Sequence, residues 1–324
     1  MTAPIHDALA SHDDYAVGPE LHAVPPHLVH EVRFRGRRAV CKVATGPLAD
    51  PVTEGRASEF VARETTVPVP EVLAVGRDPD HYVAAWVDDL PGEDPAFDEP
   101  TARAMGRGLA TLHAETEGRF DATGRLRGWA DGEVVEGEEL EAVDVDVLSL
   151  EARDTWSDTL LDRIEVRQEY LADVGYGDVA ERVAAFVRDR RGLFDAAEGT
   201  ALLHGTYLPE HVATSDGRVD CVVDFEHALV GPPEYDYLRT AIPVFANRGE
   251  EHGVPEPVFR EAYESVRSLP RGFEARREAH ALVQTVSYLR ALFVQDRHED
   301  PTEGAEWFRA HVESTLERLR ERSA

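Results

Sequence analysis

The hydrophobic pattern changes its period once along this chain of 324 residues, and the change restricts the fold to two unlike parts. Residues 28–45 alternate between apolar and polar side chains, and residues 72–75 and 81–87 are short apolar runs. These patterns predict β-strands, with Arg35-Gly36-Arg37 as a hairpin turn. Beyond the next segment, apolar residues recur at helix spacing, as along residues 100–115. We therefore expect a strand-rich part followed by a helical one.

The domain organisation follows from the same pattern. A segment rich in proline and acidic residues separates the two parts, and two short apolar runs, at 201–203 and 219–223, predict a strand pair within the helical part. The predicted divisions are an N-terminal lobe at 1–87, a linker at 88–98 and a C-terminal lobe at 99–324. The predicted helices lie at 5–12, 53–65, 100–115, 150–172, 177–196 and 233–245, with two or three more between 256 and 322.

The net charge limits the classes of partner. The chain has 63 acidic and 34 basic residues, a formal net charge of −29. Nucleic-acid binding needs basic patches that neutralise phosphates, so this class is excluded. An acidic, lysine-poor surface suits a salt-rich, halophilic cytoplasm, where ions screen self-repulsion. Because no run approaches the roughly 18 apolar residues of a membrane span and the N-terminus has no signal pattern, we expect a cytoplasmic protein.

Lys42 is the only lysine of the chain, and it follows the strand pattern of Val40-Cys41. Arginine has replaced lysine at every other basic position, so charge alone does not explain why Lys42 remains. An ammonium group is a compact point charge that donates in three directions, which suits a narrow site around the phosphates of a nucleotide. The alternative is that a single surface lysine has survived by chance.

Polar residues follow the two central strands. His204-Gly205-Thr206 comes directly after Leu203, with Glu210 and His211 a few residues further on, and Asp224 ends the run Val222-Val223. Burying an aspartate at a strand end is costly unless it is paired or binds a metal. The spacing predicts that Thr206, His211 and Asp224 lie together at one end of the strand pair. The alternative is that Asp224 caps a turn and that His204 is a core histidine.

Together with Lys42, these segments resemble the aminoglycoside phosphotransferase and choline kinase-like family. The family pattern is His-Gly-Asp, four residues, Asn, a strand ending in Asp-Phe/Trp-Glu, and Gly-Asp-Pro-x-x-Asp. The corresponding segments here are His204-Gly205-Thr206 with His211, Asp224-Phe225-Glu226, and Gly231 to Asp236. The resemblance implies an α+β, two-lobed protein-kinase-like fold, with a small antiparallel-sheet N-lobe and a larger, mainly helical C-lobe.

The resemblance also implies roles for individual residues, with ATP and Mg²⁺ as cofactors and a small molecule as the acceptor. Lys42 would contact the α- and β-phosphates, Glu54 would hold Lys42, and Asp224 would bind the metal. The backbone at Ala85, Trp86 and Val87 would bind adenine. Asp236 would brace the loop.

Two positions depart from the family pattern. Thr206 stands at the position of the catalytic aspartate, and His211 stands at that of the metal-binding asparagine. A threonine hydroxyl cannot act as a general base near neutral pH, so catalysis would be slow, with His204, Glu210 or Glu226 as further candidate catalytic groups. Imidazole at the metal position favours Mn²⁺ or Zn²⁺ over Mg²⁺, or binds no metal.

The leading interpretation is therefore an ATP-dependent phosphotransferase that acts on a hydroxyl of a small molecule. The loss of the aspartate and the asparagine supports an alternative, a catalytically silent nucleotide-binding protein. A metal-dependent hydrolase, with His204, His211, Asp224 and His227 as ligands, is a third interpretation. The resemblance leaves the acceptor open among aminoglycosides, choline, homoserine and sugars.

Overall fold

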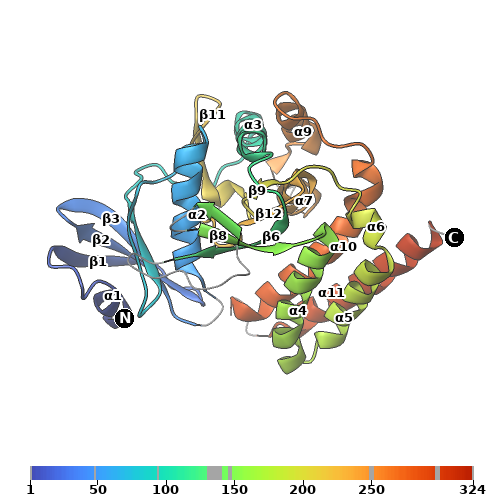
Figure 1. Ribbon diagram of the computed structural model, residues 1–324, viewed down its shortest axis with the longest axis horizontal. Coiled ribbons are helices and arrows are strands. Elements are labelled where there is room, and N and C mark those ends of the chain that lie inside the picture. Colours follow the sequence, from blue (N-terminus) through green and yellow to red (C-terminus); the bar gives the residue numbers. More distant parts are fainter. Residues whose placement is uncertain are drawn as a thin grey trace. The chain divides into compact units, whose positions relative to one another are not determined.

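The computed structural model forms two compact units that each combine distant segments. The first consists of Met1–Ala152 and Thr200–Ser268, and the second of Arg153–Gly199 and Leu269–Ala324. Figure 1 gives the order of the elements along the chain. The structure describes residues 2–46, 49–92, 95–129, 141–144, 148–247, 252–295 and 300–322, without the side chains of 141–144 and 247.

The first unit begins with a five-stranded antiparallel sheet in the order β1-β2-β3-β5-β4. Strands β2 and β3 form the predicted hairpin, and its turn residues Arg35 and Gly36 have φ angles of 50° and 74°. A two-residue turn with both φ angles positive matches the twist of the flanking strands. The strands are β1 (Tyr15–His22), β2 (His27–Phe34), β3 (Arg37–Ala44), β4 (Val72–Gly76) and β5 (His81–Ala85).

One side of this sheet is closed by α1 (Ala3–Ala8), which contacts β3. Apolar side chains from α1 and from alternate strand positions form the core there, as expected for a half-buried sheet. The buried members of this core are Ile5, Ala8, Leu9, Leu28, Val32, Phe34, Ala39, Cys41, Val43, Ala74 and Val83.

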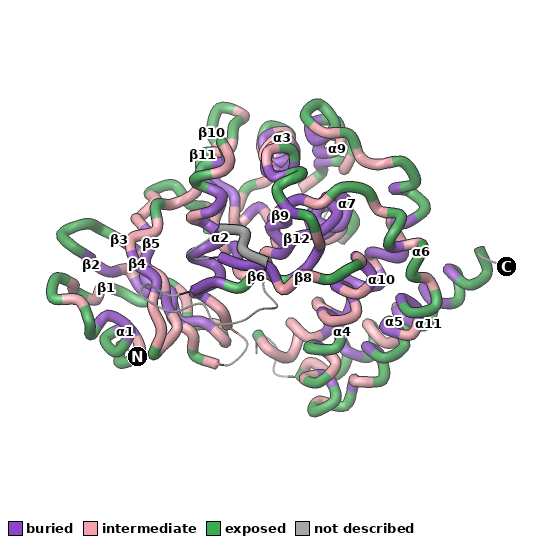
Figure 2. Tube along the Cα trace, in the orientation of Figure 1, coloured by how far each residue is buried: buried purple, intermediate pink, exposed green. Residues whose placement is uncertain are grey.

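Helix α2 (Pro51–Glu64) connects this sheet to the rest of the unit. Its N-cap is Asp50, whose side chain accepts a hydrogen bond from the Thr53 amide, and Pro51 is the first helical residue. The helix contacts β4 and β5 of the first sheet and β6 (Thr123–Gly128) of a second sheet. Figure 2 shows α2 buried along much of its length, in agreement with its contacts to strands of both sheets.

The rest of the first unit holds the second sheet, in the order β7-β8-β6-β12-β9, and the hairpin β10-β11. Strands β12 and β9 are antiparallel, and Leu229 at the start of β12 pairs with Leu203 at the end of β9. The segment that follows β9 and the segment that precedes β12 therefore lie at the same end of these strands. The other elements are β7 (Glu141–Asp144), β8 (Leu148–Arg153), β9 (Ala201–Leu203), β10 (Val212–Ser215), β11 (Arg218–Val222), β12 (Leu229–Gly231), α3 (Glu99–Thr116), α7 (Pro233–Ala241) and α9 (Glu256–Glu264).

The second unit is helical. Helix α4 (Trp156–Asp173) packs against α5 (Gly177–Asp189), and α10 (Phe273–Val294) contacts both of them and α11 (Thr302–Glu321). The short α6 (Arg191–Phe194) completes this unit. None of the described helices is long and apolar enough to cross a membrane.

The fold class predicted from the sequence is confirmed. The chain has an α+β, protein-kinase-like fold, with a small antiparallel sheet at its N-terminal end and a larger, mainly helical C-terminal part. The two compact units do not divide the chain at the predicted lobe boundaries, residues 87 and 98, because each unit combines two separate segments. The lobe boundaries stay a prediction.

Candidate active site

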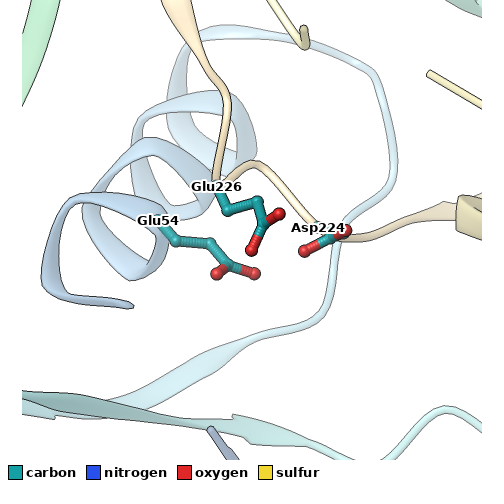
Figure 3. Close-up of side chains that lie close together, drawn as sticks. All are labelled: Glu54, Asp224 and Glu226. Carbon is teal, nitrogen blue, oxygen red and sulfur yellow. The ribbon is translucent and has the colours of Figure 1, made fainter. Parts of the chain in front are cut away.

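Lys42 lies at the centre of a buried ion cluster. Its Nζ is 2.7 Å from Glu54 Oε2 in α2, and it donates hydrogen bonds to Asp224 Oδ1 at 2.8 Å and to Glu226 Oε2 at 3.2 Å. Figure 3 shows the three carboxyl groups converging from α2 and from the segment after β11. The sequence-based prediction that Lys42 and Asp224 meet is confirmed, although 182 positions separate them in the chain.

The cluster has one ammonium group for three carboxyl groups. Burial opposes the charge of Lys42, yet Asp224, Glu54 and Glu226 together raise its pKa well above the ordinary value. Burial raises the pKa of Glu54 to about 8 against the opposing effect of Lys42. Tyr82 Oη donates a hydrogen bond to Glu54 Oε1 at 2.7 Å. Because acid groups outnumber the cation, the cluster favours a further positive charge.

Asp224 has a backbone conformation that is unusual for its residue type. Its φ angle is 70°, in the left-handed region that few residues other than glycine adopt. Backbone contacts hold the preceding residues: the Val222 amide donates to Pro68 O at 2.8 Å, and the Val223 amide donates to His211 O at 3.0 Å. Such conformations persist only where the surroundings enforce them, and they occur preferentially at functional sites.

Asp236 braces the loop that follows β9. It lies in the first turn of α7, is fully buried, and accepts hydrogen bonds from the His204 amide at 2.7 Å and the Gly205 amide at 2.8 Å. Gly205 has a φ angle of 83°, and a Cβ atom there would lie 2.2 Å from His227 O. The loop therefore requires glycine at this position, and the geometry of Asp236 agrees with the structural role that the resemblance implies.

His204 is held by backbone groups at both ring nitrogens. Nε2 donates to Val223 O at 2.9 Å, and Nδ1 accepts from the Thr206 amide at 3.2 Å. The side chain is fully buried, and burial lowers its pKa to about 4. In this position the ring stabilises the loop, while a catalytic role for His204 stays a prediction.

The buried, neutral state of His204 predicts a loss of stability in acid. Between pH of about 6.5 and about 4 the unfolded chain binds this proton and the folded chain does not, so the free energy of unfolding falls as the pH falls. The contribution is on the order of 3 kcal/mol at the acid end. Urea unfolding across this pH range measures it. His204→Gln should flatten the profile and His6→Gln, at an exposed position, should not; equal profiles would contradict the assignment.

The remaining predicted catalytic residues lie on the same loop. Thr206 Oγ1 and Glu210 Oε2 are buried and have no hydrogen-bond partner among the described residues. His211 Nδ1 donates to Thr206 O at 2.7 Å, and His211 Nε2 lies 3.2 Å from Asp224 Oδ2. The structure thus brings His211 to Asp224 as predicted and links Thr206 to this pair through its backbone carbonyl.

Two further residues of this site, Tyr82 and His27, are not predicted from the sequence, and Glu226 has more contacts than predicted. Tyr82 pairs across the strands with Lys42, and only the register of β3 and β5 in the folded sheet identifies it. His27 Nε2 lies 2.6 Å from Glu226 Oε2, a contact that no sequence pattern indicated. Glu226, predicted from the sequence only as a candidate catalytic group, contacts Lys42 and also lies 3.2 Å from His227 Nε2 through Oε1.

The segment expected to bind adenine follows β5. The Ala85 amide donates to Glu71 O at 2.8 Å and the Trp86 amide to Arg38 O at 3.2 Å. The Arg38 guanidinium stacks over the Trp86 ring, with its central carbon 3.6 Å from the ring centroid. The first two amides of the predicted Ala85–Val87 segment are therefore already used within the protein.

Comparison with known proteins identifies the family. Residues 28–282 match the model of the phosphotransferase enzyme family. The chain belongs to this family. No curated protein sequence matches the chain significantly.

Several solved structures share the fold of this family member. A candidate fructosamine-3-kinase from Thermobifida fusca is 20% identical with a TM-score of 0.64, and the match covers 99% of this chain and 98% of that one. A thermostable mutant of the aminoglycoside phosphotransferase APH(4)-Ia, in a ternary complex with AMP-PNP and hygromycin B, is 15% identical with a TM-score of 0.62 and 98% coverage of both chains. A candidate aminoglycoside phosphotransferase from Ralstonia eutropha is 14% identical, with a TM-score of 0.59 and coverage of 99% and 97%.

Proposed function

We propose that this protein is an ATP-dependent phosphotransferase that transfers the γ-phosphoryl group to a hydroxyl of a small molecule. The supporting observation is the meeting of Lys42 with Glu54 and Asp224, at 2.7 and 2.8 Å, on elements far apart in the chain. In the reaction the acceptor oxygen bonds to the γ-phosphorus, the bond to the bridging oxygen breaks, ADP leaves, and the proton of the acceptor hydroxyl passes to Glu210 or to solvent. Such a reaction depends mainly on positioning and charge neutralisation.

The chain supplies groups for each part of the nucleotide. Lys42 donates to the α- and β-phosphates, and the pair with Glu54, held by Tyr82, keeps the ammonium in position. Because the Ala85 and Trp86 amides already have acceptors, we assign adenine recognition to the Val87 amide and the carbonyl groups of this segment. A divalent cation, Mg²⁺ or Mn²⁺, would be held by Asp224 and His211 and would offset the charge of the phosphates.

A catalytically silent nucleotide-binding protein is the second candidate function. The observation that favours it is Thr206, which stands where the family pattern has its catalytic aspartate. Glu210, with a buried and unpaired carboxyl oxygen among the described residues, is the candidate replacement base. If neither group takes up a proton, the site would still bind the nucleotide.

Thermal unfolding with AMP-PNP and a divalent cation tests nucleotide binding. A ligand that binds only the folded state raises the unfolding midpoint with its concentration. We expect such a shift for the wild type and its loss in Asp224→Asn. The absence of any shift would contradict both nucleotide-based functions. Coupled detection of ADP over a panel of aminoglycosides, sugars and amino alcohols then separates transfer from silent binding.

The position of Glu54 depends on a glycine in the second sheet. The Gly128 amide donates to Thr53 Oγ1 at 2.8 Å, and a Cβ atom on Gly128 would lie 2.6 Å from Thr53 Cα. Gly128→Ala should push the first turn of α2 away from the sheet and separate Glu54 from Lys42. We expect a loss of about 1–3 kcal/mol in the free energy of unfolding and weaker AMP-PNP binding.

Gly192→Ala is the matched control, because a Cβ atom at Gly192 in α6 meets nothing within 4 Å. Alanine also has the higher helix propensity, so this variant should be as stable as the wild type or slightly more stable. Chemical unfolding and calorimetric titration with AMP-PNP compare the two. Equal behaviour of the two variants would mean that Gly128 does not position α2.

A further inference from the structure

The contact between His211 and Asp224 places two acceptor atoms face to face. His211 Nδ1 is 2.7 Å from the carbonyl oxygen of Thr206, which can only accept, so Nδ1 carries the proton. In the neutral ring, Nε2 then has a lone pair, and it lies 3.2 Å from the carboxylate oxygen Asp224 Oδ2. Two lone pairs at this distance require a positive charge between them, either a proton on Nε2 or a metal cation.

The distance matches two ligands of one metal ion. Metal bonds of about 2.0–2.2 Å from imidazole nitrogen and carboxylate oxygen, at angles between right and tetrahedral, separate the donor atoms by roughly 3.0–3.5 Å. The 3.2 Å between His211 Nε2 and Asp224 Oδ2 falls within this range. The other ring nitrogen donates to a backbone carbonyl, which is the usual orientation of a metal-binding histidine.

The neighbouring groups do not compete with a cation for Asp224 Oδ2, the oxygen that faces His211. Lys42 takes the other oxygen, Oδ1, at 2.8 Å. Both oxygens of Glu226 are already in contact with cationic or imidazole groups: Oε2 with Lys42 and His27, and Oε1 with His227. Two protein ligands leave coordination positions for water or phosphate oxygens, as in metal sites that act on a substrate rather than closed structural sites.

We propose that His211 and Asp224 form an imidazole–carboxylate site that selects a divalent transition-metal cation, such as Mn²⁺, Co²⁺ or Zn²⁺, over Mg²⁺. Mg²⁺ prefers oxygen ligands, whereas imidazole suits the transition metals. This site rests on the proposed function only in one respect, that nucleotide phosphates would complete the coordination of the metal. The two protein ligands, His211 and Asp224, do not depend on nucleotide binding.

Pulsed electron paramagnetic resonance of the full-length protein with Mn²⁺, without nucleotide, tests the site directly. A coordinated imidazole gives a nitrogen coupling in the Mn²⁺ spectrum, and an all-oxygen site does not. We expect the coupling in the wild type and in His6→Asn, an exposed control, and its absence in His211→Asn. A wild-type spectrum without nitrogen coupling overturns the proposal, whether or not the variant folds.

Calorimetric titration with Mn²⁺ and with Mg²⁺ measures the selectivity. Removing a residue that only hydrogen-bonds to a metal ligand typically lowers metal affinity about 10–100-fold. Removing a ligand itself should cost at least as much, so we expect His211→Asn to lower Mn²⁺ affinity at least about 10-fold. Mg²⁺ affinity should stay equal or rise, because the amide oxygen of asparagine suits Mg²⁺. An unchanged ratio of the two affinities overturns the proposal. Both measurements are made without ATP or acceptor, so a failure of phosphoryl transfer leaves their result intact.

Discussion

Replacing Thr206 with aspartate is expected to raise the rate of phosphoryl transfer by about 10²–10⁴-fold, the usual contribution of a positioned general base. The Thr206 hydroxyl is buried and has no hydrogen-bond partner among the described residues, so replacing it breaks no hydrogen bond of this group. A threonine hydroxyl cannot accept a proton near neutral pH, whereas a carboxylate at the same position can. In the proposed function Lys42 and Asp224 provide positioning and charge neutralisation, so proton removal would be the missing contribution.

The measurement does not require the natural acceptor. Water can take the place of the acceptor, so the release of ADP from ATP alone is compared between the wild type and the variants. Thr206→Asn is the matched control, since asparagine has the size of aspartate without its basicity. A gain with aspartate and none with asparagine assigns the position to proton transfer. Equal rates in the two variants would show that Thr206 does not occupy the catalytic position.

The sequence predicted the parts of the site that have a local pattern or a family motif. The strand with Lys42, the helix with Glu54 and the aspartate after β11 all follow from periodicity combined with the resemblance, and their meeting is confirmed. The resemblance also implied that Asp236, which ends the segment from Gly231, braces the loop.

The elements that were missed lack such a pattern. Strand β12 has only three residues, too few for any period to appear, and β6 contains two glycines, two arginines and a single large apolar residue, Leu126. Their pairing is determined by tertiary contacts, which override weak local propensity. Strand β8 also explains why α4 begins at Trp156 rather than near residue 150, because residues 148–153 are paired in the sheet.

The missing residues of the site show the same limitation. Tyr82 reaches Glu54 only because β3 and β5 pair with Lys42 opposite Tyr82, and this register is a property of the folded sheet. His27 lies at the start of β2, and its contact with Glu226 joins residues almost 200 positions apart. The sequence therefore indicates which side chains can take part in a reaction. The partners of a buried charged group are known only from the folded structure, which brings distant elements into contact.

The largest expected loss of stability follows from removing the charge of Lys42. Lys42→Met leaves Glu54, Asp224 and Glu226 in a buried cluster without their shared ammonium group. Breaking a buried ion pair by removing one partner typically costs about 3–5 kcal/mol, because the remaining charge is uncompensated. We expect a loss of this size in the free energy of unfolding, measured by urea titration near neutral pH in buffer that contains a chelator.

A second substitution shows whether the charge imbalance causes this loss. Asp224→Asn in the Lys42→Met protein removes a carboxylate that is ionised near neutral pH, and asparagine tolerates the positive φ angle of this position. The double variant should therefore recover part of the lost stability, and the coupling between the two substitutions should be favourable. Additive losses would mean that packing of the lysine stem, rather than its charge, determines the effect of Lys42→Met.

Lys42→Arg separates charge from shape. The guanidinium keeps the positive charge, so the cluster should lose less stability than in Lys42→Met, but the planar group cannot occupy the position of a compact ammonium among three carboxyl groups. We therefore expect AMP-PNP to bind more weakly to Lys42→Arg than to the wild type in calorimetric titration. If arginine binds the nucleotide equally well, charge alone suffices at this position, and the retention of a single lysine among 34 basic residues has another cause.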